Sequence, residues 1–178
     1  IQVFRDVEAG RLKLPDRYVV RTEDLRRGSG LIQHFDVGLN PTIRDLVQQM
    51  IITSDNTATD ILIGKVGIDR VNATLKQFGF KETRLRLTTG DLFREVWIRY
   101  DAKNAAMSNH EVFEKGFPTD TGGASRTFKL EGDSTRWLGR TTAREMARML
   151  EGIQAGSYAS KEHSKMMVDM MLAQFYSS

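Results

Sequence analysis

The spacing of apolar residues along the chain is mostly helical. After Pro41, apolar side chains recur at intervals of three and four residues and share one helical face: Ile43, Leu46, Val47, Met50 and Ile51. Asn40 or Thr42 can cap this helix, and Pro41 suits its first turn. The pattern therefore predicts an amphipathic helix that ends just before the polar residues at 53–56.

The same period predicts helices in several other parts of the chain. They are an opening segment closed by Gly10, a segment from Ala58 to Val66 that ends at Gly67, a segment with Val71, Leu75 and Phe78 before Gly79, a segment after Thr141 or Thr142, and a last segment after Ser160. Gly at a helix end supplies the left-handed residue that often closes a helix. These signals predict consecutive short helices with tight connections.

Between Thr88 and Trp137 the helical period is lost. Gly, Ser, Thr, Asn and Asp are frequent there, and only residues 92–100 keep an apolar character, as a short strand or a turn of helix. An irregular connection of this length is uncommon in a compact domain and is typical of a functional or interaction loop. We therefore predict a single mainly α domain over residues 1–178, with a long loop insertion at about 88–137.

Composition and charge exclude several classes of protein. The chain has 178 residues, of which 40% are hydrophobic and 28% charged, as is usual for one globular domain. Its net charge of +3 permits a basic surface, but residues 21–29 interleave Glu23 and Asp24 with arginines, which is more typical of a solvated surface than of a nucleic-acid interface. No nucleic-acid partner is expected.

Metal, thiol and membrane functions are also not indicated. The chain has no cysteine, which excludes disulfides, thiol catalysis and thiolate metal sites. Its histidines, His34, His110 and His163, do not have the spacing of a metal site, so neither a metal nor a cofactor is expected. No run of about 18 apolar residues is present, so no membrane span is predicted.

The strongest candidate site is the stretch Thr53, Ser54, Asp55 and Asn56, which separates two predicted helices without any Gly or Pro. Ser, Asp and Asn are the residues preferred at helix N-caps, so a purely structural role is one interpretation. The alternative is a site that requires a hydroxyl, a carboxylate and an amide side by side.

A longer pattern surrounds this triplet. It comprises Thr-x-Arg-Asp-Leu at 42–46, Thr-Ala and Ile-Leu at 57–62, Thr-Arg-Leu at 83–85, a Thr-Thr helix start at 141–142, and VEAGRLKL at 7–14. Together these residues resemble the helical domain of the class A β-lactamases and related penicillin-binding serine hydrolases. The resemblance covers most of the chain except the segment at 88–137, which is longer than the compact loop of the family.

This resemblance implies a fold and a chemistry. The fold would be the helical lobe of the β-lactamase-like fold, and the parent protein would act on β-lactams through an acyl-enzyme. Ser54 would pass a proton towards the lactam nitrogen, Asn56 would hydrogen-bond the acylamide of the substrate, and Asp55 would point inward, accept backbone N–H groups and fix the turn. The substrate would be a β-lactam or a peptidoglycan-type small molecule, and the protein periplasmic or secreted.

Two segments of the family pattern are not found in this sequence. The Ser-x-x-Lys motif with the nucleophile would lie just before Ile1, and the Lys-Thr-Gly strand would follow some distance after Ser178. We therefore expect the α/β lobe to be absent from this chain and the chain alone to be inactive. Complementary segments or a second chain would complete the fold.

A further departure concerns hydrolysis of the acyl-enzyme. The family has a glutamate that positions the hydrolytic water and an asparagine four residues later, and the corresponding residues here are Thr89 and Phe93. Asp91 and Glu95 are nearby carboxylates that could substitute, although a solvated surface charge is the more common role for such residues.

This departure leaves three interpretations open. The parent is a β-lactamase-like serine hydrolase, or it is a penicillin-binding D,D-peptidase or esterase-like relative. The interpretation from another class is a non-catalytic helical interaction module, which would bind a protein through the long loop or through the methionine-rich face of the last helix, residues 166–171.

Overall fold

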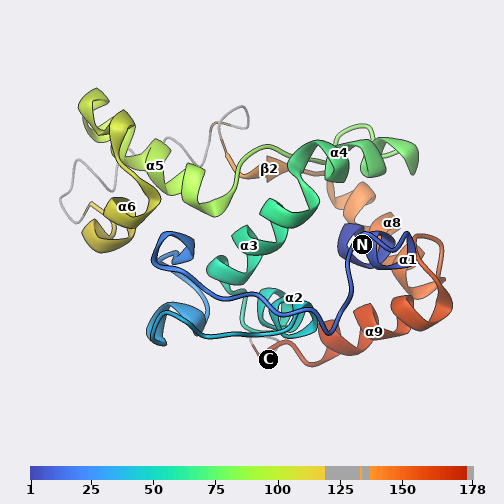
Figure 1. Ribbon diagram of the computed structural model, residues 1–178. Coiled ribbons are helices and arrows are strands. Elements are labelled where there is room, and N and C mark those ends of the chain that lie inside the picture. The colour runs from blue at the N-terminus through green and yellow to red at the C-terminus, as the bar shows by residue number, and fades with distance from the viewer. Residues whose placement is uncertain (119–132, 134–136, 176–178) are drawn as a thin grey trace.

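The computed structural model describes residues 1–118, 133 and 137–175 of the chain, and the helices dominate them (Figure 1). In chain order the elements are α1 (Gln2–Glu8), the 3-10 turns η1 (Thr22–Asp24) and η2 (Ile32–His34), α2 (Ile43–Ile52), α3 (Asn56–Val66), α4 (Ile68–Gln77), β1 (Arg84–Leu85), α5 (Thr89–Tyr100), η3 (Ala102–Ala106), α6 (Asn109–Lys115), β2 (Gly139–Arg140), α8 (Ala143–Gln154) and α9 (Lys161–Leu172). β1 and β2 pair antiparallel. The predicted mainly α class is confirmed.

The helices predicted from apolar periodicity are present. The structure also shows which of the candidate N-cap residues caps each helix. α2 begins after Thr42, whose hydroxyl accepts a hydrogen bond from the Asp45 N–H at 3.1 Å, while the Asp45 carboxylate accepts the Thr42 N–H at 2.8 Å. This reciprocal capping box satisfies two N–H groups that the helix itself leaves without a partner. α8 begins after Thr142 rather than Thr141, and α9 begins after Ser160.

The prediction of an irregular segment from residue 88 is wrong for its first part, which forms α5, η3 and α6. Thr88 caps α5, and Ser108 forms a capping box with Glu111 at the start of α6. Leu92 and Val96, four residues apart on α5, are buried on one face. Polar residues are frequent in this segment, so the apolar period did not predict these short helices. The remainder of the predicted loop, residues 119–132 and 134–136, lies outside the described residues.

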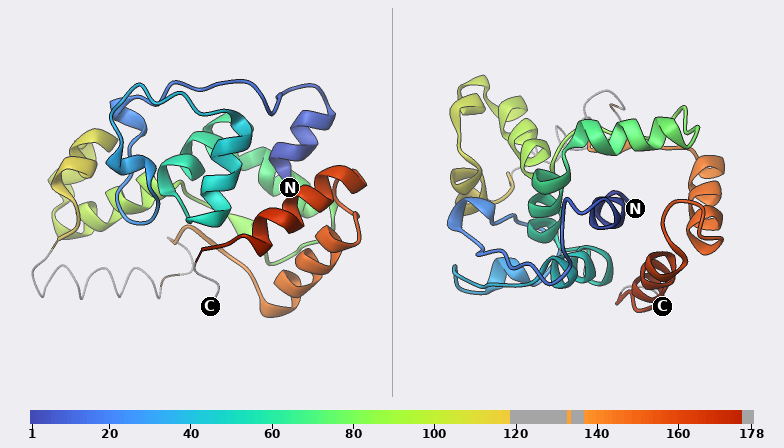
Figure 2. Two further views of the ribbon diagram at one scale, coloured as in Figure 1. Left: turned by 90° about the horizontal axis from the view of Figure 1, so that it is seen from below. Right: turned by 45° about the vertical axis from the view of Figure 1, so that its right-hand side comes forward.

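The helices are arranged along a row, with α2 and α3 in the middle (Figure 1). α5 and α6 lie at one end, and α1, α8 and α9 lie at the other. The right-hand view of Figure 2 shows α1 between α3 on one side and α8 and α9 on the other. The turn between α2 and α3, which carries the candidate site, therefore lies between the two ends of the molecule.

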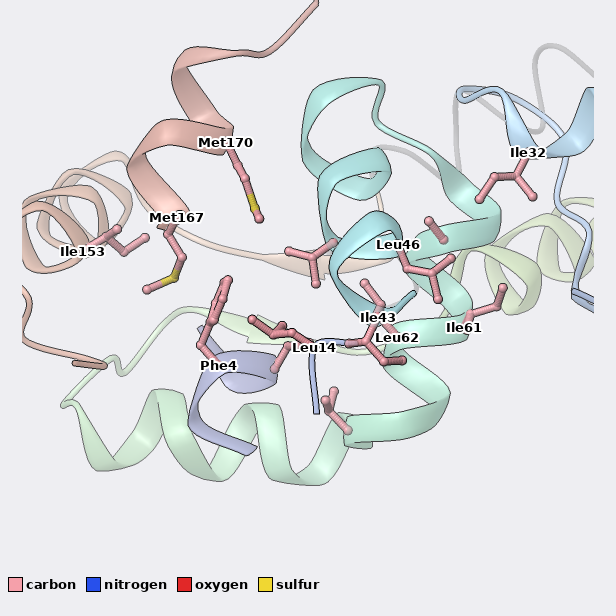
Figure 3. Packing of buried hydrophobic residues seen from close by; sticks show 14 of the residues in the cluster. Phe4, Leu14, Ile32, Ile43, Leu46, Ile61, Leu62, Ile153, Met167 and Met170 are labelled. Atoms are coloured by element: carbon pink, nitrogen blue, oxygen red, sulfur yellow. The ribbon is translucent and has the colours of Figure 1, made fainter. Parts of the chain in front are cut away.

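The main hydrophobic core joins α1, α2, α3, α8 and α9 (Figure 3). Phe4 of α1 and Leu46 of α2 are almost fully buried, and Met167 and Met170 of α9 point towards Phe4. The methionine-rich face of α9 thus contributes at least these two side chains to the core. A flexible thioether fills the irregular space between helices well.

The carboxylate of Glu145 on α8 holds the segment that leads into β1. It accepts the N–H groups of Lys81 at 2.8 Å and Thr83 at 2.7 Å, and the Thr83 hydroxyl at 2.6 Å. The Thr83 hydroxyl, and then these N–H groups, lower the pKa of Glu145 from 4.5 to about 2 although partial desolvation opposes the shift. Each of these donors favours the ionised form.

We expect Glu145 to make stability depend on pH in the acidic range. Because its pKa is lower in the folded state, its stabilisation is complete above pH 4.5 and is lost as the pH falls towards 2. Urea unfolding of wild type and Glu145→Gln should show a stability difference at pH 7 that shrinks by pH 3. The pKa values of Asp45 and Glu111 are also lowered, by hydrogen bonds from the caps of their helices, so the variant keeps a weaker pH dependence. A difference independent of pH would contradict the assignment.

Candidate functional site

The turn between α2 and α3 has an unusual backbone conformation. α2 ends at Ile52 and α3 begins at Asn56, and the chain reverses over Thr53, Ser54 and Asp55. Ser54 has φ of +52°, and it is the one residue other than glycine with a positive φ in the part of the chain that the structure describes. Such a conformation disfavours residues with a Cβ and often occurs at functional sites.

Asp55 holds this turn in place. Its side chain is 1% exposed, and its two carboxylate oxygens each accept one backbone N–H. Oδ1 caps α3 through Ala58 at 2.9 Å, and Oδ2 binds Ile32 of η2 at 2.9 Å. Asp55 thus points inward and binds N–H groups, as the resemblance implied. The N-cap of α3 is Asp55 and not Ser54, so capping does not account for Ser54.

Asn56 is fixed from the opposite side, by the segment 27–29. Its side-chain Nδ2 donates to the carbonyl oxygen of Arg27 at 2.8 Å, and its backbone N–H donates to the carbonyl oxygen of Ser29 at 3.2 Å. An asparagine amide has a second N–H and a carbonyl oxygen in addition. The amide is therefore held in one orientation while it retains groups that can bind a ligand.

The Ser54 side chain is partly exposed and forms no hydrogen bond with any described residue. Its hydroxyl is adjacent in sequence to the buried Asp55, and the strained backbone sets its direction. A partly exposed hydroxyl beside a fixed amide is an arrangement that suits proton transfer and substrate binding.

We expect Ser54→Gly to be more stable than Ser54→Ala by about 1 kcal/mol, because glycine adopts a positive φ without the steric cost of a Cβ. Both variants lack the hydroxyl, so the comparison isolates the backbone. Urea unfolding of the two proteins measures the difference. Thr53→Gly and Thr53→Ala are the matched control pair. Because φ of Thr53 is −112°, the alanine variant should be the more stable of the two. Equal stability of the two Ser54 variants would show that this backbone is not strained.

Asp60, one helical turn after Asn56, is a buried carboxylate that the sequence analysis missed. Oδ2 accepts Arg26 Nε at 2.6 Å and the Gly90 N–H at 2.8 Å. Oδ1 accepts both the backbone N–H and the hydroxyl of Thr89 at 2.7 Å. Asp60 therefore joins α3 to the segment containing Arg26 and to the first turn of α5. The sequence did contain a sign of this buried carboxylate, because Asp60 is an acidic residue inside the apolar stretch from Ala58 to Leu62.

Thr89 lies beside the triplet. It is the first residue of α5, it is buried, and its hydroxyl also approaches the carbonyl oxygen of Asn56 at 3.4 Å. The position that resembles the family glutamate thus holds a neutral side chain that donates to Asp60. Phe93 lies one turn further along α5, and a side-chain carbon added at Gly28 would lie 3.7 Å from its ring.

The two other carboxylates proposed from the sequence also lie on α5. Asp91 accepts the Thr88 hydroxyl at 2.8 Å and pairs with Arg94 at 3.4 Å, so its carboxylate is bonded within its own helix and cap. Glu95 follows one turn later and is partly buried. The contacts of Asp91 with described residues are therefore with Thr88 and Arg94 and not with the triplet.

No three His, Cys, Asp or Glu side chains are grouped to hold a metal within residues 1–118, 133 and 137–175. His163 instead pairs with Glu8 at 2.7 Å, joining α9 to α1. The helices in these ranges are also too short or too polar to span a membrane.

The family model described as "Beta-lactamase enzyme family" matches residues 1–178. The chain belongs to the β-lactamase enzyme family. No curated protein matches it significantly. The resemblance inferred from the triplet and its flanking motifs is thereby confirmed.

Several solved structures share the fold of this chain. A β-lactamase from Sphaerobacter thermophilus DSM 20745 is 28% identical with a TM-score of 0.70, and the match covers 98% of this chain and 51% of that one. The protein PBP-A is 18% identical with a TM-score of 0.67, covering 97% and 49%. A β-lactamase from Xanthomonas campestris pv. campestris str. ATCC 33913 is 19% identical with a TM-score of 0.67, covering 98% and 52%. The chain therefore spans about half the length of these relatives and forms the helical lobe of their fold.

Proposed function

We propose that this chain is the helical lobe of a serine hydrolase that reacts with β-lactams through an acyl-enzyme, and that Ser54 and Asn56 line one wall of its cleft. One observation carries the proposal: the buried Asp55 fixes a strained turn in which the Ser54 hydroxyl has no partner among the described residues and the Asn56 amide has one orientation. Family membership supplies the reaction class.

In the proposed reaction the nucleophilic serine belongs to a segment outside this chain. Its oxygen attacks the lactam carbonyl, the carbon–nitrogen bond of the ring breaks, and the nitrogen must receive a proton. The Ser54 hydroxyl passes that proton to the nitrogen and is reprotonated from the base that activated the nucleophile. The Asn56 amide binds the acylamide of the substrate and orients the carbonyl for attack.

Hydrolysis of the acyl-enzyme is proposed to be slow. Thr89 carries no carboxylate to activate water, and Asp60 next to it is occupied by four donors from Arg26, Thr89 and Gly90. A carboxylate bonded in this way is a poor general base. Asp91 and Glu95 stay candidates for water activation, with Asp91 bonded to Thr88 and Arg94. This environment favours a penicillin-binding peptidase over a fast β-lactamase.

The same proposal has consequences for the isolated chain. Without the nucleophile the chain alone is expected to be inactive, and complementary segments or a second chain would complete the cleft. The resemblance to the family leads us to expect a periplasmic or secreted protein. The rival proposal, a non-catalytic interaction module, predicts that no covalent chemistry occurs at all.

The test is intact-mass spectrometry of the full-length gene product before and after brief incubation with a penicillin. We expect a persistent added mass equal to that of the drug. Complete consumption of the drug with unmodified protein would replace slow hydrolysis with true β-lactamase activity, and Asp91→Asn and Glu95→Gln variants would then identify the base. Intact drug and unmodified protein would reject the enzyme proposal and favour the interaction module.

A further inference from the structure

Asn56 is connected to α6 through one intervening residue. The carbonyl oxygen of Arg27 accepts a hydrogen bond from Nδ2 of Asn56 at 2.8 Å, and the side chain of Arg27 contacts α6. There its Nε donates to the carbonyl oxygen of Phe113 at 2.6 Å. Its guanidinium also lies 4.6 Å from the centre of the Phe113 ring, within the range of a cation–π interaction.

The backbone next to Arg27 leaves little freedom for this connection. Gly28 has φ of +97°, and a Cβ added there would lie 2.7 Å from Nδ2 of Asn56. Gln33 Nε2 donates to the carbonyl oxygen of Gly30 at 3.1 Å, which holds the loop on its far side. A displacement of Arg27 would therefore move the acceptor on which the orientation of Asn56 depends.

The contact with Arg27 also decides which end of the Asn56 amide is available. A flipped amide would place its oxygen against the carbonyl oxygen of Arg27, where two acceptors repel each other. The observed orientation keeps the amide oxygen of Asn56 as an acceptor for another N–H. The amide thus presents its second N–H in a fixed direction as well, and this N–H can donate to the carbonyl oxygen of the side-chain amide of an acylated β-lactam or peptide.

We propose that Arg27 is a positioning residue, which transmits the contact with α6 to Asn56 and so sets the preference for substrates with a side-chain amide. This inference rests on the proposed function and extends it. A planar guanidinium suits this role because it combines a directed N–H with stacking on an aromatic ring.

The test measures the rate constants with which two penicillins acylate the full-length protein. Samples are quenched at intervals and analysed by intact-mass spectrometry. Benzylpenicillin carries a side-chain amide, and 6-aminopenicillanic acid lacks it. For Arg27→Ala we expect the rate constant of acylation by benzylpenicillin to fall roughly tenfold, with little change for 6-aminopenicillanic acid. Asn56→Ala should show the same selectivity, and the double variant should fall no further, because both residues act through one contact.

Two further variants separate positioning from general stability. Arg94→Ala is the matched control, because Arg94 Nη2 binds Asn109 Oδ1 at 2.6 Å and thus also joins α5 to α6, without contact to Asn56. It should leave both rate constants unchanged. Phe113→Leu removes the ring under Arg27 but keeps the carbonyl oxygen, so it should give the selective loss in weaker form even if Arg27→Ala fails to fold.

The outcomes distinguish this inference from the function on which it rests. Equal losses with both penicillins, additive losses in the double variant, or an unchanged ratio of the two rate constants would overturn the role of Arg27. Absence of acylation of the wild type by either compound would overturn the proposed function itself, and the inference with it.

Discussion

Replacing Asp60 with alanine is expected to lower the free energy of unfolding by about 3–5 kcal/mol, because it leaves a buried arginine without its counter-charge. The side chains of Arg26 and Asp60 are only 10% and 3% exposed. The substitution also removes the acceptor for the N–H groups of Thr89 and Gly90. Chemical denaturation by urea at neutral pH measures the loss.

Two variants calibrate this expectation. Asp60→Asn retains an acceptor of the same shape but no charge, so its loss should be smaller than that of Asp60→Ala. Asp169→Ala removes the exposed partner of Lys165, and such surface pairs contribute about 1 kcal/mol or less. If Asp60→Ala cost no more than Asp169→Ala, Asp60 would not be the link between α3, Arg26 and α5.

The helices that the sequence predicted well are those whose apolar residues face the main core. α2 illustrates this, because Ile43, Leu46 and Val47 are all buried. α5 was missed although it buries Leu92, Val96 and Trp97, and Leu92 and Val96 form a small second cluster apart from the main core. The caps of α5 and α6, Thr88 and Ser108, were readable signals, since Ser108 and Glu111 have the spacing of a capping box. Capping residues therefore indicate a helix where frequent polar residues obscure its apolar period.

The candidate site was predictable only where its residues are adjacent in sequence. The Ser54 to Asn56 triplet stays a site predicted from the sequence, and the inward position expected for Asp55 agrees with the structure. Asp60 was not recognised, since its partner Arg26 is 34 residues away and no local pattern predicts that pairing. The same holds for Arg27, whose contact with Phe113 joins residues 86 positions apart. Long-range pairs of this kind come from the fold and not from any motif.

Gly30→Ala is expected to have a large effect on both stability and the site, because Gly30 lies against the residue that fixes the turn. A Cβ at Gly30 would be 2.3 Å from the carboxylate carbon of Asp55 and 2.4 Å from its Cα. Contacts this close cannot be relieved by a rotamer change, because one of them is with the backbone. Gly30 also has φ of +102°, which a residue with a Cβ rarely adopts.

Gly38→Ala separates the clash from the cost of the backbone conformation. Gly38 has a similar φ of +94°, but nothing lies within 4 Å of an added Cβ. Both variants should lose about 1–2 kcal/mol from the positive φ, and Gly30→Ala should lose about 1–3 kcal/mol more from overpacking. Because relief of the clash requires Asp55 to move, Gly30→Ala should also slow acylation of the full-length protein by a penicillin, whereas Gly38→Ala should not. Equal losses of stability in the two variants would mean that the loop at Gly30 can move away from Asp55, and that the turn carrying Ser54 is less rigidly held than its hydrogen bonds indicate.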